Sequence, residues 1–402
     1  AREREISRIA NQDSIPGRQA IRSIIMLLDV LPAEQQERGY QMVKEWLSDE
    51  EVLAQVCIDP VGGYNEYYLP AGVIQMAVDI VNSDVVPRGS LIQHKRYGAM
   101  DRIVHLRDKF GFTVSMSSKR IKNTEGTNDE GLRLWHIGDG LTYLYNDDKT
   151  YYSDNYWATV DHQRLPGTTV NRVPGRDPKE GYGTFNPYDF AGGTDLGEYG
   201  IAGMELQGVG TSKRNGAHSR KSWFMFDDEI VCLGADINNK NMNVPVETTI
   251  DNRKLDQDGS NGFLVDGQEM DLPVKEANVK ELADRSVDVS GVACEDIRWA
   301  HVEGTESAGT GYYFPEENTE IQVRRAKTTG SWRDIGTFDG ESTENYLEMW
   351  FDHGENPAGA SYSYVLLPET DAGETEAYAA APEIAVLANN KAWQTAGVPA
   401  WW

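Results

Sequence analysis

Two arginines at the start of the chain have the spacing of side chains that bind an anion together. Arg4 and Arg8 are four residues apart, which would place both guanidinium groups on one face of a helix. Such a pair forms a fork for a carboxylate, a sulfate or sugar hydroxyls, and it lowers the pKa of a nearby tyrosine. On the spacing alone, two surface arginines balanced by Glu3 and Glu5 are the simpler interpretation.

The other residues that often do chemistry show no spacing typical of a metal centre. His136, Asp139, Asp161 and His162 do not converge as zinc or calcium ligands would. Three cysteines lie far apart in the chain: Cys57, Cys232 and Cys294. Their odd number and wide spacing favour buried free thiols over a disulfide framework. We therefore expect no cofactor and no bound metal ion.

The composition excludes some partners. With 64 acidic and 38 basic residues the chain carries a net charge of −26, which argues against a nucleic-acid-binding surface. A polyanionic substrate would need a locally positive cleft. Dispersed acidic residues are typical of a protein from a halophilic source, and equally of a merely acidic secreted protein. No apolar run approaches the roughly 20 residues of a membrane-spanning helix, and no secretory signal is visible.

The elements that would position the arginines are helices, which we expect over residues 1–86. Apolar residues recur at helical spacing from Ile21 to Leu31, and Pro32 stands where a second helix could begin. Ser48 could cap a third helix, because acidic residues follow it in the first turn. Two or three amphipathic helices are not expected to close a core alone. They therefore resemble the end of a larger helical domain.

Residues 87–402 show the alternation of β-strands. Phe110, Phe112, Val114 and Met116 alternate as in a half-buried strand. Two hairpins and four further strands are expected at these segments: 142–145 with 150–152, 223–226 with 230–233, then 311–314, 320–324, 346–351 and 361–367. The glycine-rich stretch 192–203 is interpreted as a loop or bulged strand. The pattern predicts a large antiparallel β-sandwich whose strand tyrosines, among them Tyr143, Tyr145, Tyr151 and Tyr152, are core residues.

Many segments, in order from residue 2 to near the end, resemble the polysaccharide lyase family of hyaluronate, chondroitin AC and xanthan lyases. Residues 2–8 (REREISR) resemble its RGRxISR segment, and residues 100–105 (MDRIVH) with 112–120 resemble its MDRxVH and FxxSMSSxR segments. The remaining matches are residues 125–130 (EGTNDE), 135–140 (WHIGDG), 157–161 (WATVD), 164–169 (RLPGTT), 189–193 (DFAGG), 221–234, 246–253 and 384–389.

The resemblance implies the fold and part of a site. The fold would be α+β and mainly β, with the C-terminal helices of an α/α toroid followed by a β-supersandwich. Arg4 and Arg8 match two arginines that line the family's cleft. Glu125 matches a glutamate that holds an arginine or a histidine in place, and Asn128 matches an asparagine that hydrogen-bonds the sugar. Without the resemblance, Glu125 and Asn128 would be ordinary turn residues.

The resemblance also implies the reaction. The family removes the C5 proton of a uronic acid and expels the C4 oxygen, and its Asn, His and Tyr do the central chemistry. All three lie before the RGRxISR segment, so we expect this chain to be a fragment that lacks them and the C-terminal end. His94 and Tyr97 look superficially like the family's QH…Y segment, but their place after the arginine motif favours a structural histidine.

The expected partner is an acidic polysaccharide, such as hyaluronan, chondroitin or xanthan, and the segments above do not distinguish among them. We expect a monomer with no nucleic-acid partner and no membrane span. Polymers of this size do not enter cells, which implies an extracellular or cell-surface enzyme. The alternative is a non-catalytic β-sandwich that binds carbohydrate or builds a cell-surface assembly on a lyase scaffold.

Overall fold

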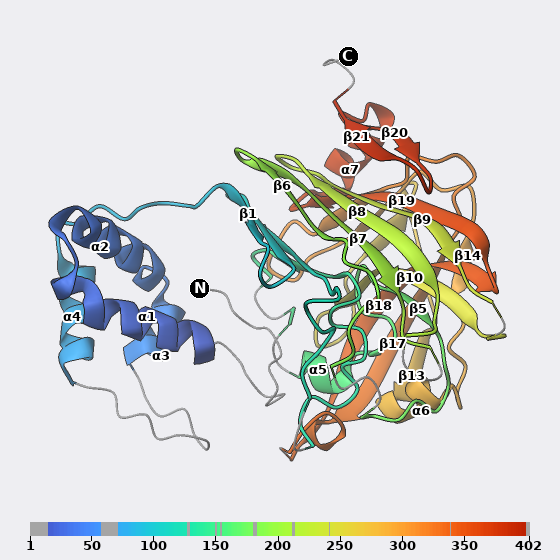
Figure 1. The fold of residues 1–402 in the computed structure, drawn as a ribbon, viewed down its shortest axis with the longest axis horizontal. Coiled ribbons are helices and arrows are strands. Elements are labelled where there is room, and N and C mark those ends of the chain that lie inside the picture. The colour runs from blue at the N-terminus through green and yellow to red at the C-terminus, as the bar shows by residue number, and fades with distance from the viewer. Residues whose placement is uncertain are drawn as a thin grey trace. The chain divides into compact units, whose positions relative to one another are not determined.

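The computed structural model describes residues 15–57, 71–126, 129–148, 151–152, 155–179, 183–210, 214–240, 242–337 and 339–398. These residues fall into two compact units that meet in sequence at Leu91 and Ile92 (Figure 1). The first unit is helical and the second consists mainly of strands, as the sequence predicts. The expected boundary between residues 86 and 87 stays a prediction.

The helical unit is held by one apolar core. Its described helices are α1 (Ile15–Leu27), the 3-10 helix η1 (Leu28–Val30), α2 (Ala33–Leu47), α3 (Glu50–Cys57) and α4 (Ala71–Asn82). The core side chains recur at helical spacing: Ile21, Ile25, Leu28, Val43, Leu47, Val56, Val73, Ala77 and Ile80. Pro32 is the N-cap residue of α2, which confirms the expected start of that helix. No described helix is long and apolar enough to cross a membrane.

The start of α3 differs by one residue from the expectation. The Asp49 carboxylate accepts a hydrogen bond from the Val52 amide at 3.3 Å, so Asp49 caps the helix. The Ser48 hydroxyl instead donates back to the Lys44 carbonyl at 2.8 Å. The prediction of Ser48 as the cap is therefore wrong, because its side chain is used by the end of α2.

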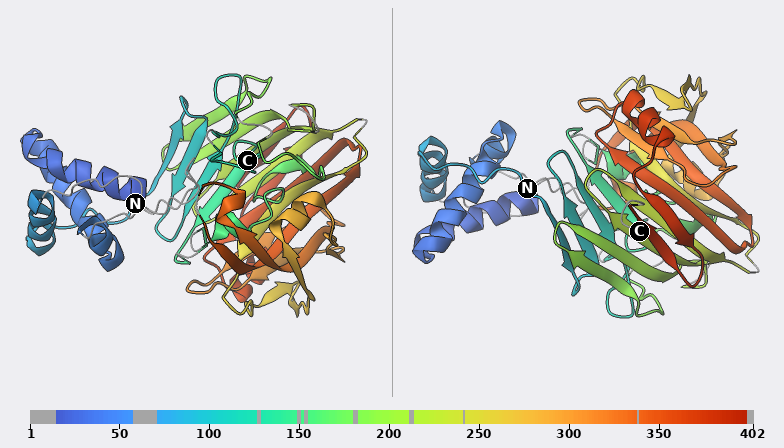
Figure 2. Two further views of the ribbon diagram at one scale, coloured as in Figure 1. Left: turned by 90° about the horizontal axis from the view of Figure 1, so that it is seen from below. Right: turned by 90° about the horizontal axis from the view of Figure 1, so that it is seen from above.

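The described residues of the second unit form four sheets, whose larger members are seen in Figures 1 and 2. One has the order β1-β2-β3-β4, one β13-β17-β18-β10-β5 with β14 on β17, one β12-β11-β15-β16-β19-β9-β8-β7-β6, and one β20-β21. Every named pair is antiparallel except β13 with β17. The strands are β1 (Gln93–Tyr97), β2 (Arg102–Leu106), β3 (Gly111–Ser115), β4 (Leu141–Tyr145), β5 (Thr169–Asn171), β6 (Ala191–Leu196), β7 (Tyr199–Gln207), β8 (His218–Met225), β9 (Ile230–Asn238), β10 (Pro245–Lys254), β11 (Phe263–Val265), β12 (Gln268–Glu269), β13 (Val274–Asn278), β14 (Val292–Cys294), β15 (Trp299–Val302), β16 (Thr310–Tyr313), β17 (Ile321–Ser331), β18 (Glu341–Glu355), β19 (Ala358–Pro368), β20 (Ala385–Asn389) and β21 (Gln394–Gly397).

Short helices connect some of these strands. They are α5 (Tyr156–Thr159), α6 (Val279–Asp284), the 3-10 helix η2 (Trp332–Asp334) and α7 (Ala372–Ala380). One large core cluster takes apolar side chains from all three larger sheets, for example Phe112 of β3, Trp223 of β8 and Leu347 of β18. Sheets that share one apolar core in this way form a sandwich, which confirms the predicted fold class.

The expectations for two segments, a strand over 150–152 and a loop or bulged strand over 192–203, are wrong. Residues 142–145 form β4, but Tyr151 and Tyr152 lie in a turn rather than in a paired strand; Lys149 and Thr150 lie outside the described residues. The Tyr152 hydroxyl accepts from the Leu144 amide at 3.0 Å, so a side chain satisfies the edge of β4. The stretch 192–203 is neither loop nor bulge, since β6 and β7 form a regular hairpin there.

Candidate functional site

Of the four residues assigned to the site, the structure describes one. Glu125 is exposed and lies in the segment that follows β3. Arg4, Arg8 and Asn128 lie outside the described residues. Their assignments stay predictions.

The segment that leads to Glu125 is fixed by a neighbouring segment that runs antiparallel to it. The Lys119 amide donates to the Tyr188 carbonyl at 2.9 Å, and the Asn123 amide donates to the Thr184 carbonyl at 3.1 Å. Between them, Lys122 and Phe185 form a β-bridge. Residues 118–123 and 184–191 therefore make a short ladder, which ends two residues before Glu125.

Asn123 anchors the end of this ladder. Its side chain is fully buried and its amide nitrogen donates to the Trp135 carbonyl at 2.7 Å. Its amide oxygen accepts from the Thr184 amide at 3.0 Å and from the Thr184 hydroxyl at 3.1 Å. Asparagine suits this position because one side chain supplies both a donor and an acceptor.

Two glycines let the chain fold closely around the same loop. A Cβ atom on Gly138 would lie 2.6 Å from the Asn123 Cα, and one on Gly131 would lie 2.6 Å from the Glu125 carbonyl oxygen. Gly131 also has a φ of +72°, which side chains rarely adopt. The backbone that carries Glu125 is thus packed against the residues of the WHIGDG segment.

A buried network of charged side chains supports the loop of Glu125. Asp139 is fully buried and its carboxylate accepts from Arg214 at 2.7 Å and from His136 Nδ1 at 3.0 Å. Burial alone would raise the pKa of Asp139, but Arg214 and His136 outweigh it and hold that pKa below its ordinary value. Burial lowers the pKa of His136, which keeps its imidazole neutral. Arg214 also donates to the Ser117 hydroxyl at 3.2 Å and so ties Asp139 to the ladder.

The ladder exposes basic side chains just before Glu125. Lys119 and Arg120 have side chains that are 57% and 49% exposed, and Lys122 is also exposed. Lys119 lies 3.4 Å from Asp189, Arg120 lies 2.8 Å from the buried Asp101, and the Lys122 amine lies 5.5 Å from the centre of the Phe185 ring. In a chain with a net charge of −26, the ladder thus gathers three exposed basic side chains and one exposed aromatic ring, and two of the three cations pair with carboxylates.

His94 is buried away from solvent, which supports its interpretation as a structural histidine. His105 Nε2 lies 2.8 Å from the Phe226 carbonyl, which can only accept, so His105 carries its proton there. The His105 Nδ1 atom is then the acceptor for His94 Nδ1, 3.4 Å away. Burial lowers the pKa of His94. Tyr97, at the end of β1, is 43% exposed.

The remaining residues that the sequence analysis weighed have structural contacts. Asp161 pairs with Arg172 at 2.9 Å, and the His162 ring stacks at 6.4 Å from Trp157. Cys232 and Cys294 are buried free thiols as expected, whereas Cys57 is half-buried. The expected core tyrosines contact one another: Tyr143, Tyr145, Tyr151 and Tyr152.

The sequence analysis did not single out Asn123 or Arg214. Asn123 stands two residues before Glu125, so it was within reach of the motif comparison. Arg214 lies 75 residues beyond Asp139 in sequence, and no local pattern connects the two.

In a comparison with known proteins, the matching family model begins where the strand-rich unit begins. The family described as "Polysaccharide lyase family 8, super-sandwich domain" matches residues 92–379. A xanthan lyase of Bacillus sp. (strain GL1) is 36% identical over 98% of this chain and 40% of its own length. A hyaluronate lyase of Thermasporomyces composti is 33% identical over 98% of this chain and 47% of its own length.

Solved structures agree with these relatives. A Paenibacillus xanthan lyase superposes with a TM-score of 0.83 at 36% identity, covering 98% of this chain and 36% of that one. The chondroitin AC lyase of Streptomyces coelicolor A3, in complex with chondroitin sulphate, gives a TM-score of 0.78 at 28% identity, covering 97% of this chain and 47% of that one. The chain thus spans less than half the length of each of these relatives.

Proposed function

The chain belongs to polysaccharide lyase family 8, and from this premise we propose that the whole protein cleaves an acidic polysaccharide by β-elimination. The observation that carries the proposal is a xanthan lyase that is 36% identical over 98% of the chain. Other relatives are a hyaluronate lyase and a chondroitinase AC, so the substrate class is a polymer that contains uronic acid.

The chemistry of the reaction defines what this chain contributes. Elimination needs neutralisation of the C5 carboxylate, a base for the C5 proton and an acid for the departing C4 oxygen. Arg4 and Arg8 would bind the acidic groups of the substrate and favour the ionised form of a nearby tyrosine. Glu125 would orient one of these arginines or a histidine, and Asn128 would hydrogen-bond the sugar.

The described loop fits the role proposed for Glu125. Its carboxylate is exposed, while the backbone before it is fixed by the buried Asn123 and by the close approach of Gly131 and Gly138. A charged group on a fixed backbone can hold a partner in one geometry, which is what orientation in catalysis requires. The exposed Lys119, Arg120 and Lys122 would attract the acidic polymer toward the loop.

We also propose that the protein acts outside the cell. The substrates named for the relatives are long polymers, which an enzyme must meet where they occur. This proposal is checked by following the protein in culture medium, in the cell-surface fraction and in lysate of the source organism.

The test of the function is an ultraviolet assay of the full-length protein with hyaluronan, chondroitin sulfate and xanthan. β-Elimination creates a double bond conjugated to the uronate carboxyl, so absorbance rises with each bond cleaved. A rise with at least one polymer is expected. Shortening of a polymer without a rise would overturn the proposal, and binding of a polymer with no cleavage at all would favour the non-catalytic scaffold instead.

A further inference from the structure

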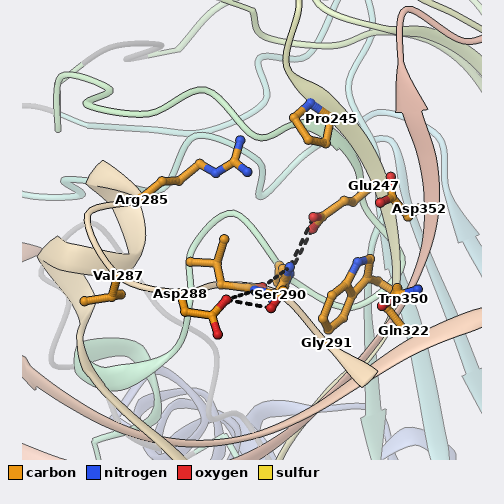
Figure 3. Close-up of a pocket in the computed structure, with 12 residues that line it drawn as sticks. Pro245, Glu247, Arg285, Val287, Asp288, Ser290, Gly291, Gln322, Trp350 and Asp352 are labelled. Atoms are coloured by element: carbon orange, nitrogen blue, oxygen red, sulfur yellow. Dashed lines mark hydrogen bonds and ion pairs between the residues drawn. The ribbon is translucent and has the colours of Figure 1, made fainter. Parts of the chain in front are cut away.

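A pocket of about 340 Å³ lies in the strand-rich unit, and none of its lining residues belongs to the loop of Glu125 (Figure 3). Strands β10, β17 and β18 form one wall, and the segment 285–291 that follows α6 forms the opposite wall. This volume lies at the lower end of the range of small-molecule sites, about 300–1,000 Å³.

The floor of the pocket is a fully paired arginine. Arg164 is 1% exposed and donates to Glu247 at 2.8 and 3.1 Å and to Glu348 at 2.7 Å. Its guanidinium also lies 3.4 Å from the centre of the Trp350 ring. Burial alone would raise the pKa of Glu247, but Arg164 and Arg172 outweigh it and keep Glu247 ionised. The floor is therefore rigid and its charges are balanced.

The opposite wall is held against this floor. Arg164 donates to the Val289 carbonyl at 3.0 Å. A Cβ atom on Gly291 would lie 2.6 Å from the Trp350 ring, so the backbone there approaches the sheet as closely as glycine permits. Because both walls are fixed by such contacts, the pocket is preformed.

Arg285 supplies a positive charge at the rim. It is half-buried and caps α6 in the left-handed conformation, with a φ of 51°. It donates one hydrogen bond, at 3.3 Å, to the Arg172 carbonyl. Within the described part of the chain, no carboxylate lies at ion-pair distance from Arg285. Figure 3 shows its side chain across the pocket from Asp352.

The side opposite Arg285 offers groups that bind hydroxyls. Asp352 is exposed and its Oδ1 accepts from the Gly354 amide at 2.8 Å, which leaves acceptor capacity on the carboxylate. Gln322 of β17 also lines the pocket on this side, whereas Ser290, whose hydroxyl donates to Asp288 at 2.6 Å, lies on the same wall as Arg285. The pocket thus presents the Arg285 guanidinium on one side and the Asp352 carboxylate with the Gln322 amide on the other.

We propose that this pocket binds one or two acidic sugar units of a polysaccharide, as a non-catalytic binding site of the same protein. A uronic acid unit carries one carboxylate and several ring hydroxyls, which matches one guanidinium facing several acceptors. The proposal rests on the proposed function for the identity of the polymer. An apolar ligand would leave the charged walls unsatisfied, and a nucleotide would need more than one available cation.

Such a site would hold a long polymer on the enzyme between cleavage events. A second contact on one polymer chain raises the effective concentration of the first, and short oligosaccharides cannot reach both. The pocket would therefore affect the affinity for long chains and leave the turnover of short chains unchanged.

The test is affinity electrophoresis of the full-length protein in gels that contain hyaluronan, chondroitin sulfate or xanthan, with dextran as the neutral polymer. Arg285→Gln is expected to weaken binding of the acidic polymer roughly ten-fold, since it removes one charge-assisted contact. Gln322→Ala, which removes a lining amide without a change of charge, is expected to weaken it in the same direction and serves if Arg285→Gln fails to fold. The control is Arg333→Gln, an exposed arginine that pairs with Asp339.

Each outcome of this test either supports or overturns the proposed binding site. Reduced retardation in both pocket variants, with Arg333→Gln like wild type and an unchanged turnover of short oligosaccharides, supports the site. Wild-type retardation of the pocket variants overturns it, as does equal retardation by dextran or no retardation of the wild type by any acidic polymer. Because retardation reports binding and not cleavage, loss of the proposed lyase activity leaves this test intact.

Discussion

At the scale of single residues, the candidate site depends on one exposed carboxylate held by buried neighbours. Glu125 has solvent access, and its own side chain contributes little to folding because exposed groups are well solvated. Asn123, His136 and Asp139 do the opposite: they are buried and make their hydrogen bonds to other residues of the protein. The residue proposed to function in catalysis and the residues that stabilise its loop are thus different residues that lie close together in sequence.

Replacing Glu125 by Gln should lower turnover at least ten-fold, because an amide holds a cationic partner less firmly than a carboxylate does. The thermal midpoint should stay that of the wild type, since the side chain is exposed. Steady-state kinetics in the full-length protein and a melting curve measure both. The exposed Glu376 of α7, changed to Gln, is the matched control; equal rates for the two variants would remove Glu125 from the site.

At the scale of elements, the sequence predicts most of the framework from periodicity. The helical spacing between Ile21 and Leu31 and the alternation from Phe110 to Met116 each identify a buried face, and the structure confirms both. The wrong expectations fall where a side-chain interaction, and not the strand pattern, determines the backbone. Tyrosine is common in strands, but Tyr152 lies in a turn, where its hydroxyl accepts a hydrogen bond from the Leu144 amide of β4.

The candidate site is less predictable from sequence than the fold. The family resemblance selects Glu125, but the contacts that fix its loop join Asn123 to Thr184 and Asp139 to Arg214, pairs that are 61 and 75 residues apart. Such pairs form only when distant segments pack, and no local spacing encodes them. The pocket beside Arg164 is likewise built from five separate stretches of chain.

Asn123→Ala tests the anchoring of the loop. The change removes three hydrogen bonds and leaves the Trp135 carbonyl and the Thr184 amide without their partner, so stability should fall by about 2–4 kcal/mol. Turnover should fall as well, because the loop of Glu125 loses its anchor. The control is Asn238→Ala, whose side-chain amide donates to Asp236 two residues before it. Denaturant unfolding that is unchanged in Asn123→Ala would contradict the anchoring role.

Gly330→Ala tests how α5 packs on β17. A Cβ atom at residue 330 would lie 1.8 Å from the Ala158 carbonyl oxygen, so α5 must move away and stability should fall by about 1–3 kcal/mol. In α4, Gly72 has no atom within 4 Å of an added Cβ. There the same change should stabilise the helix by about 0.5–1 kcal/mol. Thermal unfolding of both variants measures this difference in stability. Thermal midpoints that shift in the same direction in both variants would refute the prediction.

At the scale of the whole molecule, the strand-rich unit buries almost all of its histidines in neutral form. Burial lowers the pKa of His105 and His353 to about 4 and that of His162 to about 3, and it also lowers the pKa of three further histidines: His94, His136 and His301. Glu229 acts in the opposite direction, since burial raises its pKa to about 7.

Stability should therefore fall as the pH falls from about 6.5 toward 4. In this window the unfolded chain binds protons on histidines that the folded chain keeps neutral, so acid favours unfolding. The raised pKa of Glu229 makes the folded state more stable as the pH falls through part of the same range. This single carboxyl opposes six imidazoles, so the net effect of acid is destabilising. The thermal midpoint should drop by roughly 5–10 °C between about pH 7 and pH 5. A midpoint that is flat or rises on acidification would contradict the buried neutral histidines.

The large net charge of −26 belongs to the same scale. It repels a polyanion at long range, so the basic residues beside Glu125 and the guanidinium of Arg285 must act locally. Family membership supports the proposed reaction, and the fold supplies the fixed loop on which that reaction would depend.

The most direct test of the central claim is to let the full-length protein digest its polymer in water labelled with heavy oxygen and to weigh the products. Elimination breaks the bond without adding water, so the new chain ends should carry no heavy oxygen and should be lighter by one water than hydrolysis products. Incorporation of one heavy oxygen atom per cleaved bond would show hydrolysis and would contradict the account of this protein as a polysaccharide lyase.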